Sequence, residues 1–264
     1  MKTRIISGAV MALILAAILA VGFLWQSIVI TIAVALLAAG AVFELIHNAA
    51  GIKKKTIVIG ACLFAALTVI AGNTLFIYGL ISVIVLYGVF AAVMILVNHK
   101  EFDIGKIALV YALPVPFSLA FYLLNAIINS ENGFYYLLLL LVFSCVCDMG
   151  AYFTGVTIGK HKLCPEISPK KTVEGAVGGI VASLIFAVVI SLLFKKFSIG
   201  VIVATVPLCV LGMIGDLFAS AIKRSVGLKD YGNLIPGHGG IMDRVDSIIM
   251  IAPLMFVLML WEVI

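Results

Sequence analysis

The sequence has few charged residues, and this scarcity excludes an ordinary water-soluble protein. Only 11% of its 264 residues are Asp, Glu, Lys or Arg, whereas 64% are hydrophobic. So little polar surface cannot cover a core of that apolar content. No long stretch lacks an apolar run of near-spanning length, so we expect one polytopic membrane domain over residues 1–264.

The cysteines also show no pattern of a metal site or a disulfide framework. The five cysteines are an odd number, and they lack the spacing of a zinc site: Cys62, Cys145, Cys147, Cys164 and Cys209. We expect buried, inert thiols. The sequence also has no internal repeat that would indicate the inverted halves of a transporter.

Apolar windows predict an all-α integral membrane protein with about nine transmembrane helices. The predicted spans are 5–24, 27–46, 56–72, 75–97, 106–127, 134–157, 174–194, 200–222 and 246–263. Only Gly72, Asn73 and Thr74 separate the third and fourth spans, which predicts a tight helical hairpin. Pro114 and Pro116 predict a kink in the fifth span.

The basic residues predict the orientation in the membrane. With the N-terminus inside, every Lys and Arg except Lys195 and Lys196 falls in an inside segment. This bias predicts an inner-membrane protein with a cytoplasmic N-terminus and an extracytoplasmic C-terminus. The basic face can attract anionic membrane lipids and polyphosphates, although topology control alone also explains it. We expect no nucleic-acid partner.

Polar residues concentrate in the second half of the chain. We divide the chain into an N-terminal helical part, 1–130, and a catalytic part, 134–264, with cytoplasmic loops at about 158–173 and 223–245. Asp243 and Asp246 lie three residues apart at the start of a helix, so their carboxylates share one face. Two acids together with substrate phosphates are ligands that Mg²⁺ favours. The alternative is that both acids only complement the helix dipole.

The segment before these acids combines glycines with positive charge. Gly239 and Gly240 follow His238, and such glycines let backbone N–H groups approach a phosphate, although they also occur in plain turns. Four cations surround the segment: Lys223, Arg224, Lys229 and Arg244. Clustered cations, carboxylates and glycines favour a metal-bound polyphosphate over a solvated linker.

Two acids interrupt otherwise apolar spans, namely Asp148 and Asp216. A carboxylate at mid-bilayer costs about 2.5–3.5 kcal/mol, so each needs a partner or a polar cavity. Asp216 precedes Lys223 by two helical turns, and we interpret it as a third metal ligand. Asp148 is either a ligand or a structural hydrogen-bond partner.

The loop before the seventh span carries Lys170 and Lys171 just ahead of a helix N-terminus. Two cations beside a helix N-terminus form an anion site, or they serve only as inside-positive anchors. Thr172 is expected to cap that helix. Gly175 and Gly179 form a small-residue face for close helix packing.

Three stretches together resemble the phosphatidate cytidylyltransferases, also called CDP-diacylglycerol synthases. The longest runs Ser220-x-Ile222-Lys223-Arg224-x4-Lys229-Asp230-x-Gly232-x2-Ile235-Pro236-x-His238-Gly239-Gly240-Ile241-x-Asp243-Arg244-Val245-Asp246 and is similar to the family signature throughout. The others are Asp148-x-x-Ala151-Tyr152-x-x-Gly155 and Ser168-Pro169-Lys170-Lys171-Thr172-x-Glu174-Gly175. Val156 departs from the family pattern, which usually has a basic residue there. The first five spans match only in hydropathy.

The resemblance implies transfer of CMP from CTP to phosphatidic acid, giving CDP-diacylglycerol and pyrophosphate. It also implies dependence on one or two Mg²⁺ ions. The expected metal ligands are Asp216, Asp243 and Asp246, with Asp148 as a further candidate. Lys223, Arg224 and His238 are expected to join the acids in catalysis, and the expected substrate-binding residues are Lys229, Arg244, Gly239, Gly240, Ser168, Lys170, Lys171 and Thr172. A homodimer is an open expectation.

Two other functions remain alternatives at this point. A related CTP-dependent lipid-alcohol kinase would need a base for a neutral hydroxyl, whereas the phosphatidate nucleophile is already anionic. His238 is therefore expected to organise the loop or donate to phosphate. A transporter would use Asp148 and Asp216 for ion coupling, but carriers place their ligands near the midplane of the membrane.

Overall fold

The computed structural model describes all residues except 1–12, 14–15, 23–26, 101–103 and 235–238. Its elements are α2 (Ser27–Phe43), η1 (Glu44–Ala49), α3 (Lys55–Val97), α4 (Ile104–Ala112), α5 (Pro114–Ile128), α6 (Gly133–Leu141), η2 (Val142–Val146), α7 (Cys147–Ile158), β1 (Lys162–Cys164), β2 (Ser168–Thr172), α8 (Val173–Leu193), α9 (Ile199–Ser225) and α10 (Met242–Leu260). The two η segments are π-helices. The predicted helical membrane protein is confirmed, with one small β-hairpin that the sequence did not predict.

Seven of the described helical segments are long and apolar enough to cross a membrane. They are Ser27–Ala49, Lys55–Leu75, Ile77–Val97, Leu109–Ile128, Gly133–Ile158, Val173–Leu193 and Ile199–Ser225. The predicted span 5–24 lies mostly outside the described residues. Helix α10 covers most of the predicted last span, but Asp243, Arg244 and Asp246 occupy its start. The count of nine spans and the orientation of the termini stay predictions.

The chain forms two compact units. Unit 1 contains residues 1–126 and 226–244, and unit 2 contains residues 127–225 and 245–264. The first boundary lies close to the predicted division near residue 130. Most of the predicted loop 223–245 groups with unit 1, whereas the predicted loop 158–173 lies in unit 2.

In unit 1, helix α3 turns back on itself. The rings of Phe64 and Tyr87 stack with centroids 4.1 Å apart, whereas a straight helix would separate these residues by roughly 35 Å. At Gly79 an added Cβ would lie 2.6 Å from the carbonyl oxygen of Ala71, so the turn requires a residue without a side chain there. The hairpin predicted at 72–74 is confirmed.

The predicted proline kink is also present in unit 1. Helix α4 ends at Ala112 and α5 begins at Pro114, so the fifth predicted span is two helices. Pro114 has no N–H to continue the hydrogen-bond ladder, and its ring disfavours a helical conformation of the preceding residue. Local sequence chemistry therefore sets this break.

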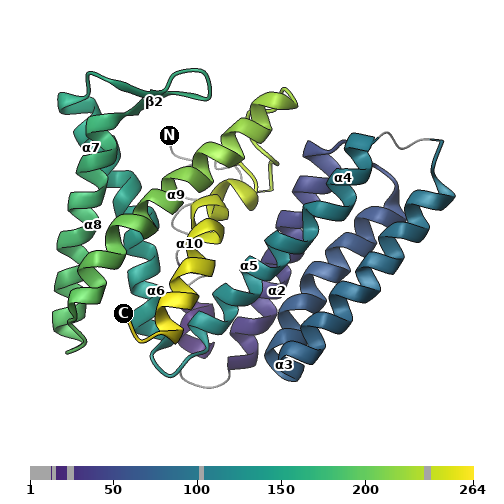
Figure 1. Cartoon of the computed structure of the whole chain (residues 1–264), viewed down its shortest axis with the longest axis horizontal. Helices are drawn as coiled ribbons and strands as arrows, with labels where there is room; N and C mark the ends of the chain where they lie inside the picture. The colour runs from purple at the N-terminus through teal and green to yellow at the C-terminus, as the bar shows by residue number, and fades with distance from the viewer. Residues whose placement is uncertain (1–12, 14–15, 23–26, 101–103, 235–238) are drawn as a thin grey trace. The chain divides into compact units, whose positions relative to one another are not determined.

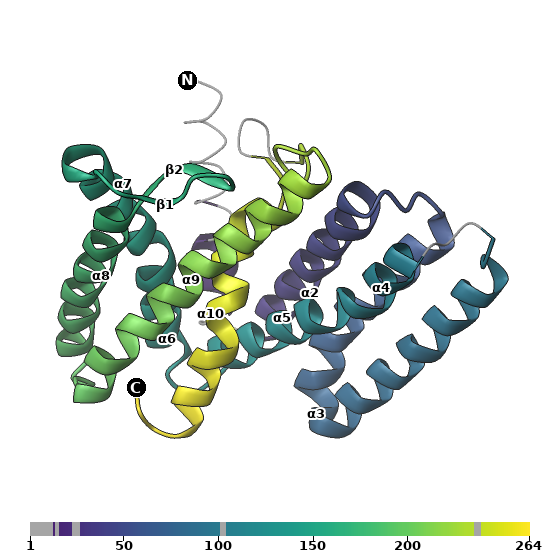
Figure 2. The same cartoon turned by 45° about the horizontal axis from the view of Figure 1, so that its top comes forward.

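In unit 2, helix α8 buries a face of small residues. Every fourth residue is small and buried: Gly175, Gly179, Ser183, Ala187 and Ser191. An added Cβ at Gly179 would lie 2.6 Å from the carbonyl oxygen of Cys147, and one at Gly175 would lie 2.7 Å from that of Ala151. Helices α7 and α8 can therefore pack closely along their length (Figures 1 and 2).

The opposite face of α8 carries large apolar side chains that remain exposed. They are Val173, Val177, Val181, Ile185, Phe186, Val189, Leu192 and Leu193. In water an exposed apolar stripe of this length would favour aggregation, whereas in a membrane it can contact lipid chains. The helix is thus sorted by side-chain size, with its small face inward and its large face outward.

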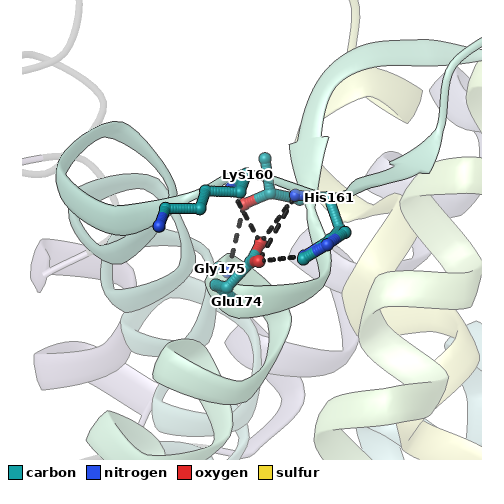
Figure 3. A network of polar contacts seen from close by, with 5 residues as sticks. Lys160, His161, Glu174 and Gly175 are labelled. Atoms are coloured by element: carbon teal, nitrogen blue, oxygen red, sulfur yellow. Dashed lines mark hydrogen bonds and ion pairs between the residues drawn. The ribbon is translucent and has the colours of Figure 1, made fainter.

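The predicted loop 158–173 contains an antiparallel hairpin of β1 and β2, in which Lys162 pairs with Thr172. Glu174, in the first turn of α8, binds the residues that directly precede this hairpin (Figure 3). Its carboxylate accepts hydrogen bonds from the backbone N–H of Lys160 at 3.1 Å and of His161 at 3.2 Å, and it lies 2.6 Å from Nδ1 of His161. The hairpin is therefore fastened to the N-terminus of α8.

Thr172 caps α8, as predicted, since its hydroxyl accepts the N–H of Gly175 at 3.1 Å. We expect Thr172→Ala to lower the free energy of unfolding by about 1 kcal/mol, because a helix N–H loses its partner. The thermal midpoint in detergent measures this loss. Thr157→Ala is the control, because the Thr157 hydroxyl donates only to a carbonyl of its own helix. Equal midpoints for the two variants would contradict the assigned cap.

Candidate active site

Three acids from three helices of unit 2 form one electrostatic cluster. Asp148 lies in α7, Asp216 in α9 and Asp246 in α10. The charge of Asp246 interacts with those of Asp216 and Asp148, and the charge of Asp148 interacts with that of Asp216. The structure thus brings together Asp216 and Asp246, two of the predicted metal ligands, and adds Asp148.

Two lysines balance this cluster. The Nζ atom of Lys171, on β2, lies 2.5 Å from Oδ2 of Asp216. Lys223 is buried, with 7% of its surface exposed, and its charge acts on Asp246. A buried ammonium requires such a partner, because its desolvation is costly. The cluster therefore combines acids with cations, a combination that suits the binding of phosphates and a metal ion.

Close packing of α9 against α10 places Asp216 beside Asp246. An added Cβ at Gly215 would lie 2.6 Å from the backbone carbonyl oxygen of Asp246. At Gly212 the nearest atom is instead Cδ1 of Ile251, the flexible end of a side chain, at 2.9 Å. The sequence therefore needs glycine at 215 so that α9 can approach the backbone of α10 at Asp246.

We expect Gly215→Ala to destabilise the protein by about 1–3 kcal/mol, because the new methyl group meets backbone that cannot move aside. Gly212→Ala is the matched control, since a side-chain rotation relieves its contact. Thermal midpoints in detergent and product formation should both fall more for Gly215→Ala. Equal effects of the two substitutions would contradict this account of the packing.

A cavity of about 520 Å³ opens beside the cluster, within unit 2. Its lining residues are Asp148, Ala151, Tyr152, Gly155, Val156, Gly159, Lys162, Leu163, Ser168, Lys170, Lys171, Thr172, Gly175, Ala176, Met213 and Asp216. The four predicted substrate-binding residues of the hairpin, Ser168, Lys170, Lys171 and Thr172, all line it. Lys162 was not predicted, although it stands in the same hairpin as Lys170.

The remaining predicted residues belong to the signature loop, most of which lies in unit 1. Asp243 organises this loop: its Oδ2 accepts the N–H of Tyr231 at 2.8 Å and that of Gly240 at 3.0 Å. Gly239 adopts a positive φ of 85°, which favours glycine. The N–H of Gly240 thus already donates to a carboxylate. The predicted binding of phosphate by the N–H groups of Gly239 and Gly240 stays a prediction. His238 lies outside the described residues.

Asp243 and Asp246 both lie near the start of α10, as predicted. Oδ2 of Asp243 accepts hydrogen bonds from its own loop, whereas the charge of Asp246 interacts with those of Asp148 and Asp216 in unit 2. The role of Asp243 as a metal ligand therefore stays a prediction. The exposed cations Arg224, Lys229 and Arg244 also keep their phosphate roles as predictions.

Glu44, a buried carboxylate of unit 1 that is only 3% exposed, was not predicted from the sequence. Its oxygens accept the N–H of Ile241 at 2.9 Å and that of Met242 at 2.8 Å. These N–H groups stand at the start of α10, where a helix has no partners of its own. An acid inside the second predicted span was the signal, the same one that identified Asp148 and Asp216.

Asn48 supports the same loop from the same π-helix, η1. Its Nδ2 donates to the carbonyl oxygen of Tyr231 at 2.5 Å, and Tyr231 is 1% exposed. Glu44 and Asn48 are four residues apart in η1 and both hold the loop. Single π-turns inside helices are frequent at functional sites. We call Glu44, Asn48 and Asp243 the loop clasp.

A metal fits the chemistry of the acid cluster, although the geometry does not form a ready-made cage. Among the described residues, no three His, Cys, Asp or Glu side chains are grouped so that they could hold a metal ion. Mg²⁺ rarely uses an all-protein cage; it takes one or two carboxylates together with substrate phosphates and water. Asp216 and Asp246 supply such carboxylates, and Lys171 neutralises Asp216 in this structure.

Comparison with known proteins decides the family. Residues 2–261 match the family model described as the cytidylyltransferase family. The chain belongs to the cytidylyltransferase family. This match confirms the resemblance that the signature carried, and it extends over the first five spans, where sequence analysis found agreement only in hydropathy.

Curated relatives of this family member are named phosphatidate cytidylyltransferase. The protein of Staphylococcus haemolyticus is 42% identical over 133 residues, and that of Staphylococcus saprophyticus is 44% identical over 133 residues. The protein of Bacillus subtilis is 44% identical over 138 residues. Each alignment covers 49–50% of this chain and 51% of the relative. The chain thus spans about half the length of the curated relatives it matches.

Proposed function

We propose that the protein transfers CMP from CTP to phosphatidic acid, giving CDP-diacylglycerol and pyrophosphate. The observation that carries this proposal is the cluster of Asp148, Asp216 and Asp246 with Lys171 and Lys223 beside a cavity. The family match over residues 2–261 and the names of the relatives support it.

In the proposed reaction, a phosphate oxygen of phosphatidic acid attacks the α-phosphorus of CTP. The bond from the α-phosphorus to its bridging oxygen breaks, and the electron pair leaves on pyrophosphate. The nucleophile is already anionic, so no general base is needed and His238 is assigned to the loop. Lys171, Lys223, Arg224, Lys229 and Arg244 neutralise phosphate charge as it moves to the leaving group.

Mg²⁺, as one or two ions, belongs to this proposal. Asp216 and Asp246 would hold it, with Asp243 as the third ligand suggested by the signature and Asp148 as a further candidate. A divalent cation held there would neutralise part of the negative charge of the substrate phosphates. Lys171 is paired with Asp216 in the structure. Because a lysine side chain is flexible, its ammonium group can turn from Asp216 to a substrate phosphate when a metal ion binds the carboxylate.

We place the protein in the inner membrane with its site facing the cytoplasm, the N-terminus inside and the C-terminus outside. The uneven distribution of lysine and arginine supports this orientation. A site at that surface lets water-soluble CTP meet a lipid whose chains stay in the bilayer. A homodimer also stays part of the proposal.

A labelled-substrate assay tests the function. Purified protein in detergent is incubated with α-³²P-labelled CTP, phosphatidic acid and Mg²⁺, and we expect label in the lipid phase with equimolar pyrophosphate. Diacylglycerol replaces phosphatidic acid in a parallel reaction with γ-labelled CTP. Label in lipid phosphate there would establish the kinase instead, and no turnover in either reaction would exclude both enzymes.

A further inference from the structure

The cavity of unit 2 is lined partly by the membrane-spanning helices and partly by the β-hairpin. Its lysines are Lys162, Lys170 and Lys171, and all three lie outside the candidate spans. Tyr152, Val156 and the other lining residues from α7, α8 and α9 lie within those spans. The cavity thus lies where a span meets the membrane surface.

Apart from Asp148 and Asp216, the residues that line the cavity from within the spans are small or apolar, and this lining continues onto exposed surface. Tyr152 and Val156 line the cavity, yet 66% and 70% of their surfaces are exposed. Met149, Phe153 and Ile158 extend this exposed apolar surface along the same helix, α7. Such a surface in a spanning helix suits contact with acyl chains.

The hairpin side of the cavity is cationic. Lys171 is paired with Asp216, but no ion pair among the described residues involves Lys162 or Lys170. Both lysines are exposed on the paired strands β1 and β2. A phosphomonoester carries a charge of about −1.5 to −2 near neutral pH, and two ammonium groups would match it.

We propose that this cavity is the lipid site, in which Lys162 and Lys170 bind the phosphomonoester of phosphatidic acid and Tyr152 and Val156 border its acyl chains. This inference rests on the proposed function, because it assigns one of the two substrates. The lipid phosphate then lies near the Lys171–Asp216 pair, where the attack on CTP would occur. A nucleoside triphosphate is polar throughout and leaves the apolar side of the cavity without a partner.

Binding without turnover tests the assignment. Dioctanoyl phosphatidic acid is titrated calorimetrically into the purified full-length protein in detergent, with CTP left out. The double variant Lys162→Gln/Lys170→Gln should bind this lipid roughly tenfold or more weakly, since two charge-assisted contacts are lost. Lys160→Gln is the matched control, because Lys160 is exposed nearby but does not line the cavity.

Kinetics and a second ligand sharpen the test. The KM for phosphatidic acid should rise in the double variant while the KM for CTP stays within about twofold. Wild-type protein should bind dioctanoyl phosphatidic acid more tightly than glycerol 3-phosphate, which has the phosphate but no acyl chains. Unchanged lipid affinity in the double variant, equal affinity for the two ligands, or a rise mainly in the KM for CTP would overturn the assignment. Wild-type protein that binds the lipid but forms no CDP-diacylglycerol would overturn the proposed function and leave the lipid site standing.

Discussion

Asp246→Asn and Asp216→Asn are each expected to lower the rate of CDP-diacylglycerol formation by roughly 10²- to 10³-fold. Asparagine keeps the shape of the side chain but removes its negative charge. In the structure this charge interacts with Lys223 for Asp246 and pairs with Lys171 for Asp216. Without this charge, the cluster loses a carboxylate that would hold Mg²⁺. The neighbouring lysine also loses the negative charge that attracts its ammonium group.

The measurement is the initial rate of transfer of α-labelled CMP to lipid, over a range of Mg²⁺ concentrations. Glu166→Gln is the control, because Glu166 is an exposed acid of the same unit that lies outside the cluster. Thermal midpoints show whether the variants remain folded. Full activity in both asparagine variants, with Glu166→Gln equally active, would remove Asp216 and Asp246 from the catalytic site.

Glu44→Ala is expected to lower both stability and activity, although Glu44 lies in none of the stretches that match the family signature. The substitution leaves the buried N–H groups of Ile241 and Met242 without an acceptor, at a cost of about 1–3 kcal/mol for each. The loop that carries Asp243 would then lose its position. Misplacement of this kind can cost roughly 10²-fold in rate.

Glu44→Gln separates the two effects, because glutamine keeps one acceptor oxygen in the loop clasp. We expect an intermediate thermal midpoint and intermediate activity for this variant. Glu131→Gln, at an exposed acid, should match the wild type in both. If Glu44→Ala had the thermal midpoint and the activity of Glu131→Gln, the loop clasp would have no role in holding the loop.

Several parts of the fold could be predicted because they depend on neighbours in sequence. The helical spans follow from apolar runs, and the break before Pro114 follows from a missing N–H. The reversal in α3 and the cap at Thr172 likewise depend on residues a few positions apart. The paired strands β1 and β2 were not predicted, because their segment is short and has a strongly polar composition.

The candidate site was predicted less completely, for a physical reason. Asp216 could be selected because an ionisable residue in an apolar span is costly and needs a partner or a function. Asp246 could be selected because it follows Asp243 by three residues at the start of a helix. Their lysine partners could not be assigned, since Lys171 reaches Asp216 only through the packing of the hairpin and α9. Local patterns identify which side chains need partners but do not identify the partners.

The sequence by itself determined that the protein lies in a membrane, where most of its helices run, and which acids and lysines are candidates for the chemistry. Tertiary structure alone decided that Asp148 joins Asp216 and Asp246, and that Glu44 holds a loop 197 residues away. Hydropathy and helix period act between near neighbours, whereas contacts between distant segments depend on how whole helices pack. At Gly215 that packing brings α9 against the backbone of α10 at Asp246, so that the charges of Asp216 and Asp246 interact.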